Sequence, residues 1–232
     1  MLQKEDILFE DNHIIVVRKP QNIPTQADIT GDVDMLSLVK EYIKETYHKP
    51  GNVYVGLVHR LDRPTGGVMV FAKTSKAAAR LSEQLKTDAF QKTYFAVVAG
   101  TPRERAGRLE HYLKKDEKEN KVVIVPMLTE GAKKAVLNYK VLEEAQGYSL
   151  VQIQLITGRS HQARVQMASL KTPIYGDAKY GKHATTTNNL NLFAVELRFE
   201  HPVQKTQMVF RAYPPTEKPM WNLFHLEKYL EF

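Results

Sequence analysis

Short apolar runs separated by turn residues are the commonest pattern along this 232-residue chain. Residues 7–20, ILFEDNHIIVVRKP, contain two such runs on either side of a Glu-Asp-Asn turn, which predicts a hairpin that Pro20 ends. Most of the other predicted strands also arrive in adjacent pairs. These strands and hairpins are expected at residues 54–58, 68–73, 93–100, 102–126, 135–157 and 191–215.

A helical spacing of apolar residues occurs in only four segments. Residues 35–47 have Asp34 as a candidate cap, and residues 75–86 have Ser75. The segment 158–171 opens with Gly-Arg-Ser, so Ser160 is its candidate N-cap. Residues 217–230, EKPMWNLFHLEKYL, predict an amphipathic helix. Paired strands with a few helices between them indicate an α+β fold with a largely antiparallel or mixed sheet.

The composition is ordinary for a soluble globular domain, with 43% hydrophobic and 25% charged residues. No apolar run approaches the length of a membrane span, and the N-terminus does not resemble a signal peptide. Cysteine is absent, which excludes disulfides and thiolate metal sites. We therefore expect a single cytoplasmic domain. The net charge of +7 suggests a polyanionic partner, although many basic proteins bind no nucleic acid.

Several common catalytic signatures are missing from the chain. Neither GxGxxG nor GxxxxGK[ST] occurs, which argues against nucleotide-dependent chemistry. HExxH and the zinc deaminase signature are also missing, as is the GxSxG elbow of serine hydrolases. We therefore expect no metal and no cofactor.

Asp62 is a single acid between two arginines, Arg60 and Arg63, in GLVHRLDRPTGGVMVFAKT. Two neighbouring cations favour its ionised form, which can attack an electrophile or stabilise positive charge. The arginines can also neutralise the phosphates of a bound nucleotide. The alternative is a solvated turn with weak local ion pairs. The charge pattern alone does not decide between these two readings.

Two further segments carry candidate residues. Tyr94 lies in the strand-like run KTYFAVVAG, where most tyrosines are core or rim residues. Arg159 begins the segment GRSHQARVQ, in which His161, Gln162 and Arg164 follow within a turn. A helix N-terminus of this kind suits an anion, whereas the alternative is a capped helix with polar residues in its first turn.

These segments together resemble the RluA family of RNA pseudouridine synthases. HRLDRPTGG is similar to the catalytic signature H-R-L-D-x-x-[ST]-[ST]-G of that family. EDNHIIVVRKP, KTYFAVVAG, LITGRSHQARVQ and PIYGDAKYG resemble its other motifs, in the same order and over nearly the whole chain. The chain departs from the pattern at Gly66, where a serine or threonine is usual, and at Gln166 and Phe193, where histidine is frequent.

The resemblance implies the pseudouridine synthase fold, a mixed, mostly antiparallel and bisected β-sheet flanked by helices with a central cleft. It implies one catalytic domain over residues 1–232, without the small N-terminal RNA-binding domain of many relatives. The implied reaction isomerises uridine in rRNA or tRNA to pseudouridine, after the target base is flipped out of an RNA loop. We expect a monomer that needs no protein partner.

The resemblance also implies roles for the candidate residues. Asp62 is the expected catalytic carboxylate, Arg159 the residue that pairs with it, and Tyr94 the residue that packs on the flipped base and helps to remove the carbon 5 proton. RNA or supporting contacts are expected from His59, Arg60, Arg63, Thr65, His161, Gln162 and Arg164.

Two alternatives have different consequences for Asp62. An inactive RNA-binding or RNA-folding factor could keep the same scaffold. A glycosidase would need a second positioned carboxylate, and none is evident beside Asp62. The charged segment KKDEKENK, residues 114–121, is either an RNA-clamping loop or a solvated turn.

Overall fold

The computed structural model describes residues 2–181 and 190–230, which group into two compact units. Unit 1 comprises the residues up to Gln91 together with Glu196–Ala212, and unit 2 comprises Lys92–Val195 and the residues from Tyr213 onward. The chain therefore leaves unit 1, builds most of unit 2 and returns. The expectation of one catalytic domain over the whole chain stays a prediction.

Unit 1 is built on antiparallel strands. The predicted hairpin near the N-terminus is confirmed, since the Asp11 carboxylate accepts the N–H groups of His13 and Ile14 at 2.7 and 2.8 Å and closes its turn. The hairpin near residue 201 is confirmed as well. The pairs are β1 (Ile7–Glu10) with β2 (Ile14–Lys19), β2 with β4 (Gly66–Ala72), β4 with the short β3 (Gly56–Leu57), and residues 196–200 of β10 (Leu192–Glu200) with β11 (Gln207–Arg211).

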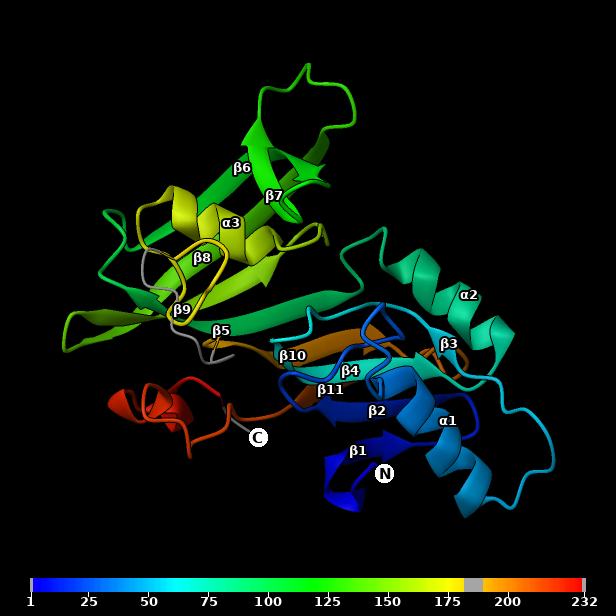
Figure 1. Ribbon diagram of the computed structural model, residues 1–232. Coiled ribbons are helices and arrows are strands. Elements are labelled where there is room, and N and C mark those ends of the chain that lie inside the picture. Colours follow the sequence, from blue (N-terminus) through cyan, green and yellow to red (C-terminus); the bar gives the residue numbers. More distant parts are fainter. Residues whose placement is uncertain (1, 182–189, 231–232) are drawn as a thin grey trace. The chain divides into compact units, whose positions relative to one another are not determined.

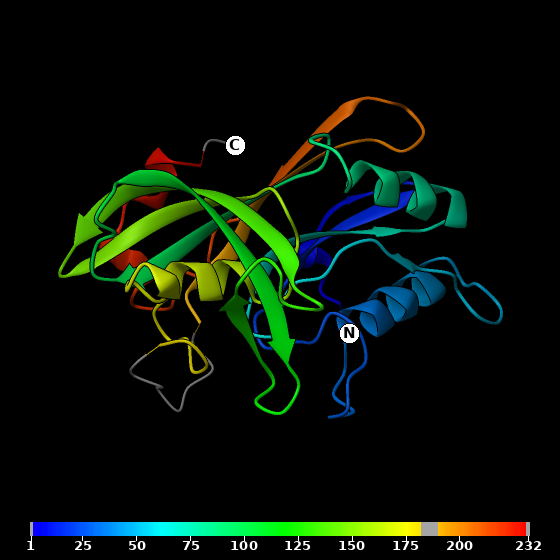
Figure 2. The same cartoon turned by 90° about the horizontal axis from the view of Figure 1, so that it is seen from above.

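Two helices accompany these strands. Helix α1 (Met35–Thr46) lies across β2 on one face of the sheet (Figures 1 and 2), and Asp34 caps it by accepting the Ser37 N–H. Helix α2 (Ser75–Gln84) confirms the second predicted helix, but the predicted cap is wrong. Thr74 has the extended backbone of an N-cap, and its hydroxyl accepts the Ala77 N–H, so Ser75 is already the first helical residue. A 3-10 turn, η1 (Lys4–Asp6), precedes β1.

Unit 2 contains a longer antiparallel array in the order β5-β9-β8-β6-β7. The charged segment 114–121 is confirmed as the end of a long hairpin, and Gly147 lies in the turn between β8 and β9. Helix α3 packs across this array (Figures 1 and 2). The strands are β5 (Gln91–Ala99), β6 (Ala106–Asp116), β7 (Lys121–Val125), β8 (Lys133–Ala145) and β9 (Tyr148–Leu155).

Helix α3 (Gln162–Ser169) begins later than predicted. Ser160 is not its N-cap. His161 holds that position with a left-handed backbone, φ +51°, and makes no side-chain capping bond. The side chain of Gln162 instead accepts the Arg159 N–H at 3.0 Å, which satisfies the backbone of the preceding turn.

The predicted C-terminal helix is wrong. Residues 217–230 contain two 3-10 turns, η2 (Trp221–Leu223) and η3 (Leu226–Lys228), separated by the extended residue Phe224. Glu143 on β8 accepts both the N–H and the ring N–H of His225, at 3.0 and 2.8 Å. The segment is amphipathic because it buries Trp221 and Leu226, and its anchoring to β8 replaces helical hydrogen bonds.

The elements together confirm the α+β prediction. In the described part of the chain, every helix is too short or too polar to cross a bilayer. The expected central cleft stays a prediction.

Candidate active site

Asp62 lies in the connection between β3 and β4 in unit 1. The Thr65 N–H donates to the Asp62 carbonyl oxygen at 2.9 Å, which closes a tight turn around the carboxylate. The Thr25 hydroxyl donates to the Leu61 carbonyl at 2.8 Å and fixes the turn from the side. Gly67 has φ +127°, a conformation that side chains rarely adopt, so the second glycine of the motif is required by the backbone. Gly66 has no such φ.

Lys19, which the sequence analysis did not identify, supports this turn from within unit 1. Its side chain is fully buried, and Nζ donates to the carbonyl oxygens of Pro20, Arg63 and Thr65 at 3.0, 3.1 and 2.8 Å. Burial lowers the pKa of Lys19 to about 7, while the Asp62 charge opposes this and the Arg63 charge adds to it. The sequence signal that could have identified Lys19 is a lysine directly before proline, at the end of an apolar strand.

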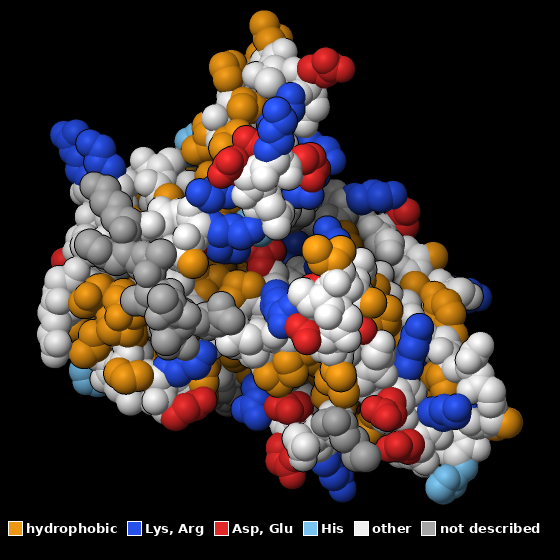
Figure 3. Space-filling model, viewed as in Figure 1, with side chains coloured by type: hydrophobic (Ala, Val, Ile, Leu, Met, Phe, Trp, Pro, Cys, Tyr) orange, Lys and Arg blue, Asp and Glu red, His pale blue; other side chains and the backbone are white. Residues whose placement is uncertain are grey.

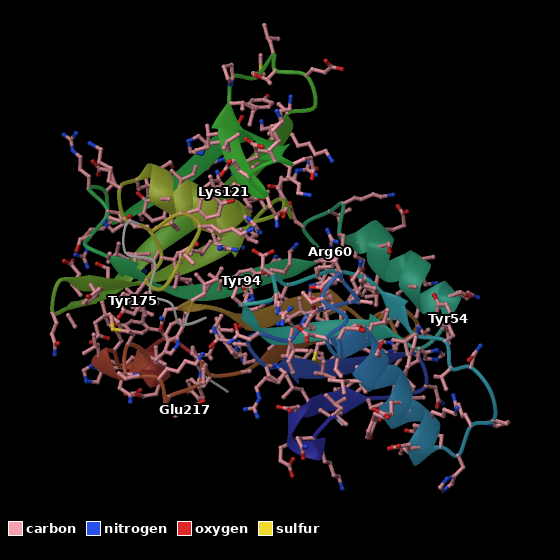
Figure 4. All side chains as sticks on the ribbon, viewed as in Figure 1. Tyr54, Arg60, Tyr94, Lys121, Tyr175 and Glu217 are labelled. Carbon is pink, nitrogen blue, oxygen red and sulfur yellow. The ribbon has the colours of Figure 1, made fainter. Side chains whose placement is uncertain are left out.

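Arg63 and Arg60 have different surroundings. The Arg63 guanidinium donates to the Asn22 carbonyl at 3.2 Å and to the Thr30 hydroxyl at 3.1 Å, and it pairs with Asp32. It is therefore held by the 28–32 loop of its own unit. Arg60 is exposed (Figure 4). The Arg63 side chain is also partly exposed, at 39%, but its guanidinium is engaged by these partners.

The other two predicted residues of this turn are buried. The His59 Nε2 atom accepts the Val70 N–H at 3.2 Å, and its ring meets Phe90 edge-on. His59 therefore anchors the turn to β4. The Thr65 hydroxyl is buried and has no hydrogen-bond partner among the residues that the structure describes. A buried polar atom of this kind beside Asp62 is a candidate contact for a bound ligand.

Tyr94 lies in β5 of unit 2, opposite Ile153 of β9 (Figure 4). Only 5% of the Tyr94 surface is exposed, which agrees with its interpretation as a core residue. A catalytic role for Tyr94 stays a prediction. Lys92, two residues earlier on the same strand face, is a second residue that the sequence analysis missed. A Cβ atom on Gly158 would lie 3.1 Å from Lys92 Nζ, so this ammonium borders the Arg159 turn. Burial lowers the pKa of Lys92.

Gln162 shapes the Arg159 turn in unit 2. Besides the Arg159 N–H, its Oε1 atom accepts the Thr157 hydroxyl at 2.7 Å, and its Nε2 atom donates to the Val136 carbonyl at 2.9 Å. The Arg159 side chain is exposed and donates through Nε to the Lys134 carbonyl at 2.9 Å. The pairing of Arg159 with Asp62 joins residues of the two units and stays a prediction.

Arg164 and His161 bind the loop that follows α3. Arg164 makes two hydrogen bonds to the Asp177 carboxylate, at 2.8 and 2.7 Å, and both side chains are almost completely buried. His161 Nδ1 lies 2.8 Å from the Tyr180 hydroxyl. Gln162 and Arg164, predicted as RNA or supporting contacts, thus make hydrogen bonds inside unit 2: Gln162 supports the Arg159 turn, and Arg164 supports the loop at Asp177.

Metal-binding groups are not gathered at either turn. Among the described residues, no cluster of three His, Asp or Glu side chains is arranged to hold a metal ion.

Comparison with known proteins identifies the family. The family model for RNA pseudouridylate synthase matches residues 13–169, more than half of the chain. An uncharacterized RNA pseudouridine synthase of Bacillus subtilis, YhcT, is 34% identical over 221 residues, which cover 94% of this chain and 70% of that protein. The ribosomal large subunit pseudouridine synthase D of Vibrio parahaemolyticus is 31% identical over 91% of this chain and 68% of that protein.

Solved structures support the fold assignment. The human RNA pseudouridylate synthase domain containing 4 matches with a TM-score of 0.77 and 24% identity, covering 94% of this chain and 91% of that one. The domain containing 1 protein matches with a TM-score of 0.72 over 90% and 83%. Nothing in these comparisons favours an inactive RNA-binding factor. The chain therefore belongs to the RNA pseudouridylate synthase family, in its RluA group, and is an isomerase that acts on RNA.

Proposed function

We propose that this protein converts uridine to pseudouridine in the large-subunit ribosomal RNA, with Asp62 as the catalytic carboxylate. The observation that carries the proposal is the Asp62 turn, whose backbone is fixed by Lys19 and Thr25 while the carboxylate belongs to a matching catalytic signature. Relatives named for ribosomal large subunits, at 31% identity and above, support this choice of RNA.

The reaction breaks the bond between N1 of uracil and C1′ of ribose. The base then rotates, a bond forms between C5 and C1′, and C5 loses its proton while N1 gains one, so the product is an isomer. Asp62 contributes a negative charge and a nucleophilic oxygen at the ribose or at the base. The turn holds the backbone of Asp62 in place before the substrate arrives, which lowers the entropic part of the barrier.

Arg159 and Tyr94 complete the proposed site. Arg159 pairs with the Asp62 carboxylate and directs it, which the exposure of its guanidinium allows. Tyr94 packs on the flipped uracil and assists removal of the C5 proton. Thr65 adds a hydroxyl that hydrogen-bonds the nucleotide beside Asp62. Tyr94 and Thr65 thus act on the reacting nucleotide, and Arg159 acts through Asp62.

Exposed cations of the two units provide contacts to the RNA backbone. Arg60 is the proposed contact beside Asp62, because Arg63 is engaged by Asn22, Thr30 and Asp32. The charged hairpin of residues 114–121 provides lysines in unit 2. Phosphate contacts of this kind make the affinity fall with rising salt.

The test is formation of pseudouridine in a large-subunit rRNA transcript by purified wild-type protein and by Asp62→Asn, measured by mass spectrometry of digested RNA. Because the variant loses the attacking charge, we expect its rate to fall by about 10³-fold or more while RNA affinity is kept. Asp88→Asn, an exposed acid of the same unit, is the matched control and keeps the wild-type rate. A fully active Asp62→Asn protein would disprove the role of Asp62, and product only in tRNA would disprove the choice of RNA.

A further inference from the structure

The Tyr180 hydroxyl joins two elements of unit 2 that are far apart in sequence. It accepts the N–H of Val122, at the start of β7, at 2.7 Å, and it lies 2.8 Å from Nδ1 of His161, directly before α3. The two rings also meet edge-on, with centroids 5.7 Å apart. One atom thus connects the charged hairpin to the segment that carries Arg159.

On the β7 side, this connection is held by strand pairing and by buried side chains. In the order of strands within unit 2, β7 is the outer strand, and its backbone pairs with β6 through partners that include Lys115 and Val122. The Val122 side chain belongs to a small buried cluster against which Tyr180 packs. The neighbouring Lys179 ammonium donates to the Asn120 carbonyl at 2.5 Å. Two consecutive side chains therefore hold the end of the hairpin.

The loop that carries Tyr180 is held by internal hydrogen bonds. Asp177 Oδ1 accepts the N–H groups of Lys179 and Tyr180 at 2.9 and 3.2 Å, while the same carboxylate is bound by Arg164. The Arg164 guanidinium lies 5.3 Å from the centroid of the Tyr180 ring, within the range of a cation–π interaction. A Cβ atom on Gly181 would lie 2.6 Å from the Asp177 carbonyl oxygen, so the turn closes only with glycine.

The His161 side of the connection is strained. His161 has φ +51°, which costs free energy in any residue with a side chain, and it makes no capping bond of its own. The Val165 N–H donates to the His161 carbonyl at 3.0 Å, and Arg159 is only two residues earlier. The Gln162 N–H donates to the Arg159 carbonyl at 3.2 Å, so His161 lies inside the turn that begins at Arg159, and the Tyr180 hydroxyl contacts the His161 ring.

We propose that Tyr180 is a positioning residue for the reaction. Through His161 it fixes the backbone that directs Arg159, and the hydrogen bond from β7 holds the Tyr180 hydroxyl in place. The inference rests on the proposed function, because the role of Arg159 is assigned there. Figure 3 shows Lys and Arg side chains among acids over β6 and β7, below apolar side chains at the tip. Met127 and Leu128, in the connection that follows β7, are exposed. RNA bound to this surface would contact the same strand that supports Tyr180.

The test is Tyr180→Phe, which keeps the ring and removes only the hydroxyl. We expect the single-turnover rate of pseudouridine formation to fall about 10-fold, because one oriented hydrogen bond is lost. The dissociation constant for the RNA should stay within about 2-fold, since no contact to phosphate is removed. Tyr139→Phe is the matched control: its hydroxyl donates to the Glu104 carbonyl in the same unit, and both constants should keep their wild-type values.

A second variant, His161→Gln, tests the same connection from its other end. The double variant combines Tyr180→Phe with His161→Gln. If the Tyr180 hydroxyl acts through His161, the rate of the double variant should lie within about 2-fold of the rate of His161→Gln alone. If the two residues act independently, the two fold-losses in rate should multiply. His161→Gln by itself should also lower the rate without weakening RNA binding. The single variant His161→Gln keeps the test decisive even where Tyr180→Phe fails to fold, and a wild-type rate in it would overturn the inference.

Three results would overturn the inference while the wild type still forms pseudouridine. They are a wild-type rate in Tyr180→Phe or in His161→Gln, a loss of RNA affinity as large as the loss of rate in either variant, or independent losses in the double variant. A wild-type protein that forms no pseudouridine in any RNA would instead overturn the proposed function, so the two failures are distinguishable.

Discussion

The turn that carries Asp62 and the turn that carries Arg159 are stabilised by different chemistry. A buried lysine, Lys19, donates to two carbonyl oxygens of the Asp62 turn, and it does so from the end of a neighbouring strand. A neutral amide, Gln162, bridges the Arg159 turn from one residue inside the following helix. The first bridging group is a titratable cation, whereas the amide of Gln162 does not titrate.

The difference has a consequence for pH. Burial lowers the pKa of Lys19 to about 7, so its charge changes within the range in which enzymes are assayed. An ammonium has three N–H donors for its three carbonyl partners, and the neutral amine has only two. The hydrogen bonds that Lys19 makes to the Asp62 turn should therefore depend on pH, and those that Gln162 makes to the Arg159 turn should not.

The largest effect in this comparison is expected for Lys19→Met. Three carbonyl groups lose the Lys19 ammonium as a donor and the Asp62 turn relaxes, so we expect the rate to fall about 100-fold. Single-turnover assays across pH should also lose any inflection near the pKa of Lys19. Lys86→Met, at an exposed site of the same unit, is the control. It should keep the wild-type rate and the wild-type pH profile.

The stability of the Lys19→Met protein provides a second measurement. Wild-type Lys19 has a pKa lowered from 10.5 to about 7, so between these values the unfolded chain binds more protons than the folded one. The free energy of unfolding should therefore rise with pH across this window, by up to a few kcal/mol, and urea unfolding at about pH 7 and about pH 9.5 measures the rise. A variant with the same rise as the wild type would show that Lys19 is not its source.

A smaller effect is expected for Gln162→Leu. The substitution leaves the Arg159 N–H, the Thr157 hydroxyl and the Val136 carbonyl without this partner, so we expect a rate about 10-fold lower and a stability lower by about 1–3 kcal/mol. Both losses should be the same at every pH. Gln204→Leu at an exposed position is the control. A loss that varies with pH would contradict the distinction between the two turns.

The smallest effect is expected for Thr65→Val, which removes a buried hydroxyl that has no partner among the described residues. Folding should not suffer, and the melting temperature should stay or rise, because an unpaired polar group is replaced by a methyl. If the hydroxyl binds the nucleotide, the rate should nevertheless fall about 5-fold. Thermal unfolding and single-turnover assays measure the two effects, and an unchanged rate would exclude Thr65 from the site.

Sequence pattern was a good guide where a signal is local. The alternation of apolar residues identified the hairpins, and Asp34 identified the start of α1 correctly. The sequence pattern predicted the wrong N-cap at Ser75 and at Ser160. Several neighbouring polar residues can cap a helix, and the backbone geometry selects one of them. The sequence pattern failed again at residues 217–230, where an amphipathic pattern reports burial of Trp221 and Leu226 but not the helix type.

In the candidate site, too, the residues with a local sequence signal were predicted and those without one were missed. Asp62 was found because its motif is contiguous, and Gln162 was noticed within the Arg159 segment. Lys19 was missed because its hydrogen bonds reach residues 44 and 46 positions away, a separation at which sequence pattern has no signal. Tyr180 lies in a quoted motif, but its partner Val122 is 58 positions distant, so its bridging role had no local signal.

The sequence by itself determined the family, the α+β class and the identity of the candidate carboxylate, since each depends on residue types at short, fixed spacings. The tertiary structure decided which polar groups are buried and what they bind. It assigned Gln162 and Arg164 to internal hydrogen bonds, tied Arg63 to the 28–32 loop and placed Lys19 beneath the Asp62 turn. Burial and pairing depend on segments that meet only when the chain folds, and the pKa of a lysine follows from that environment.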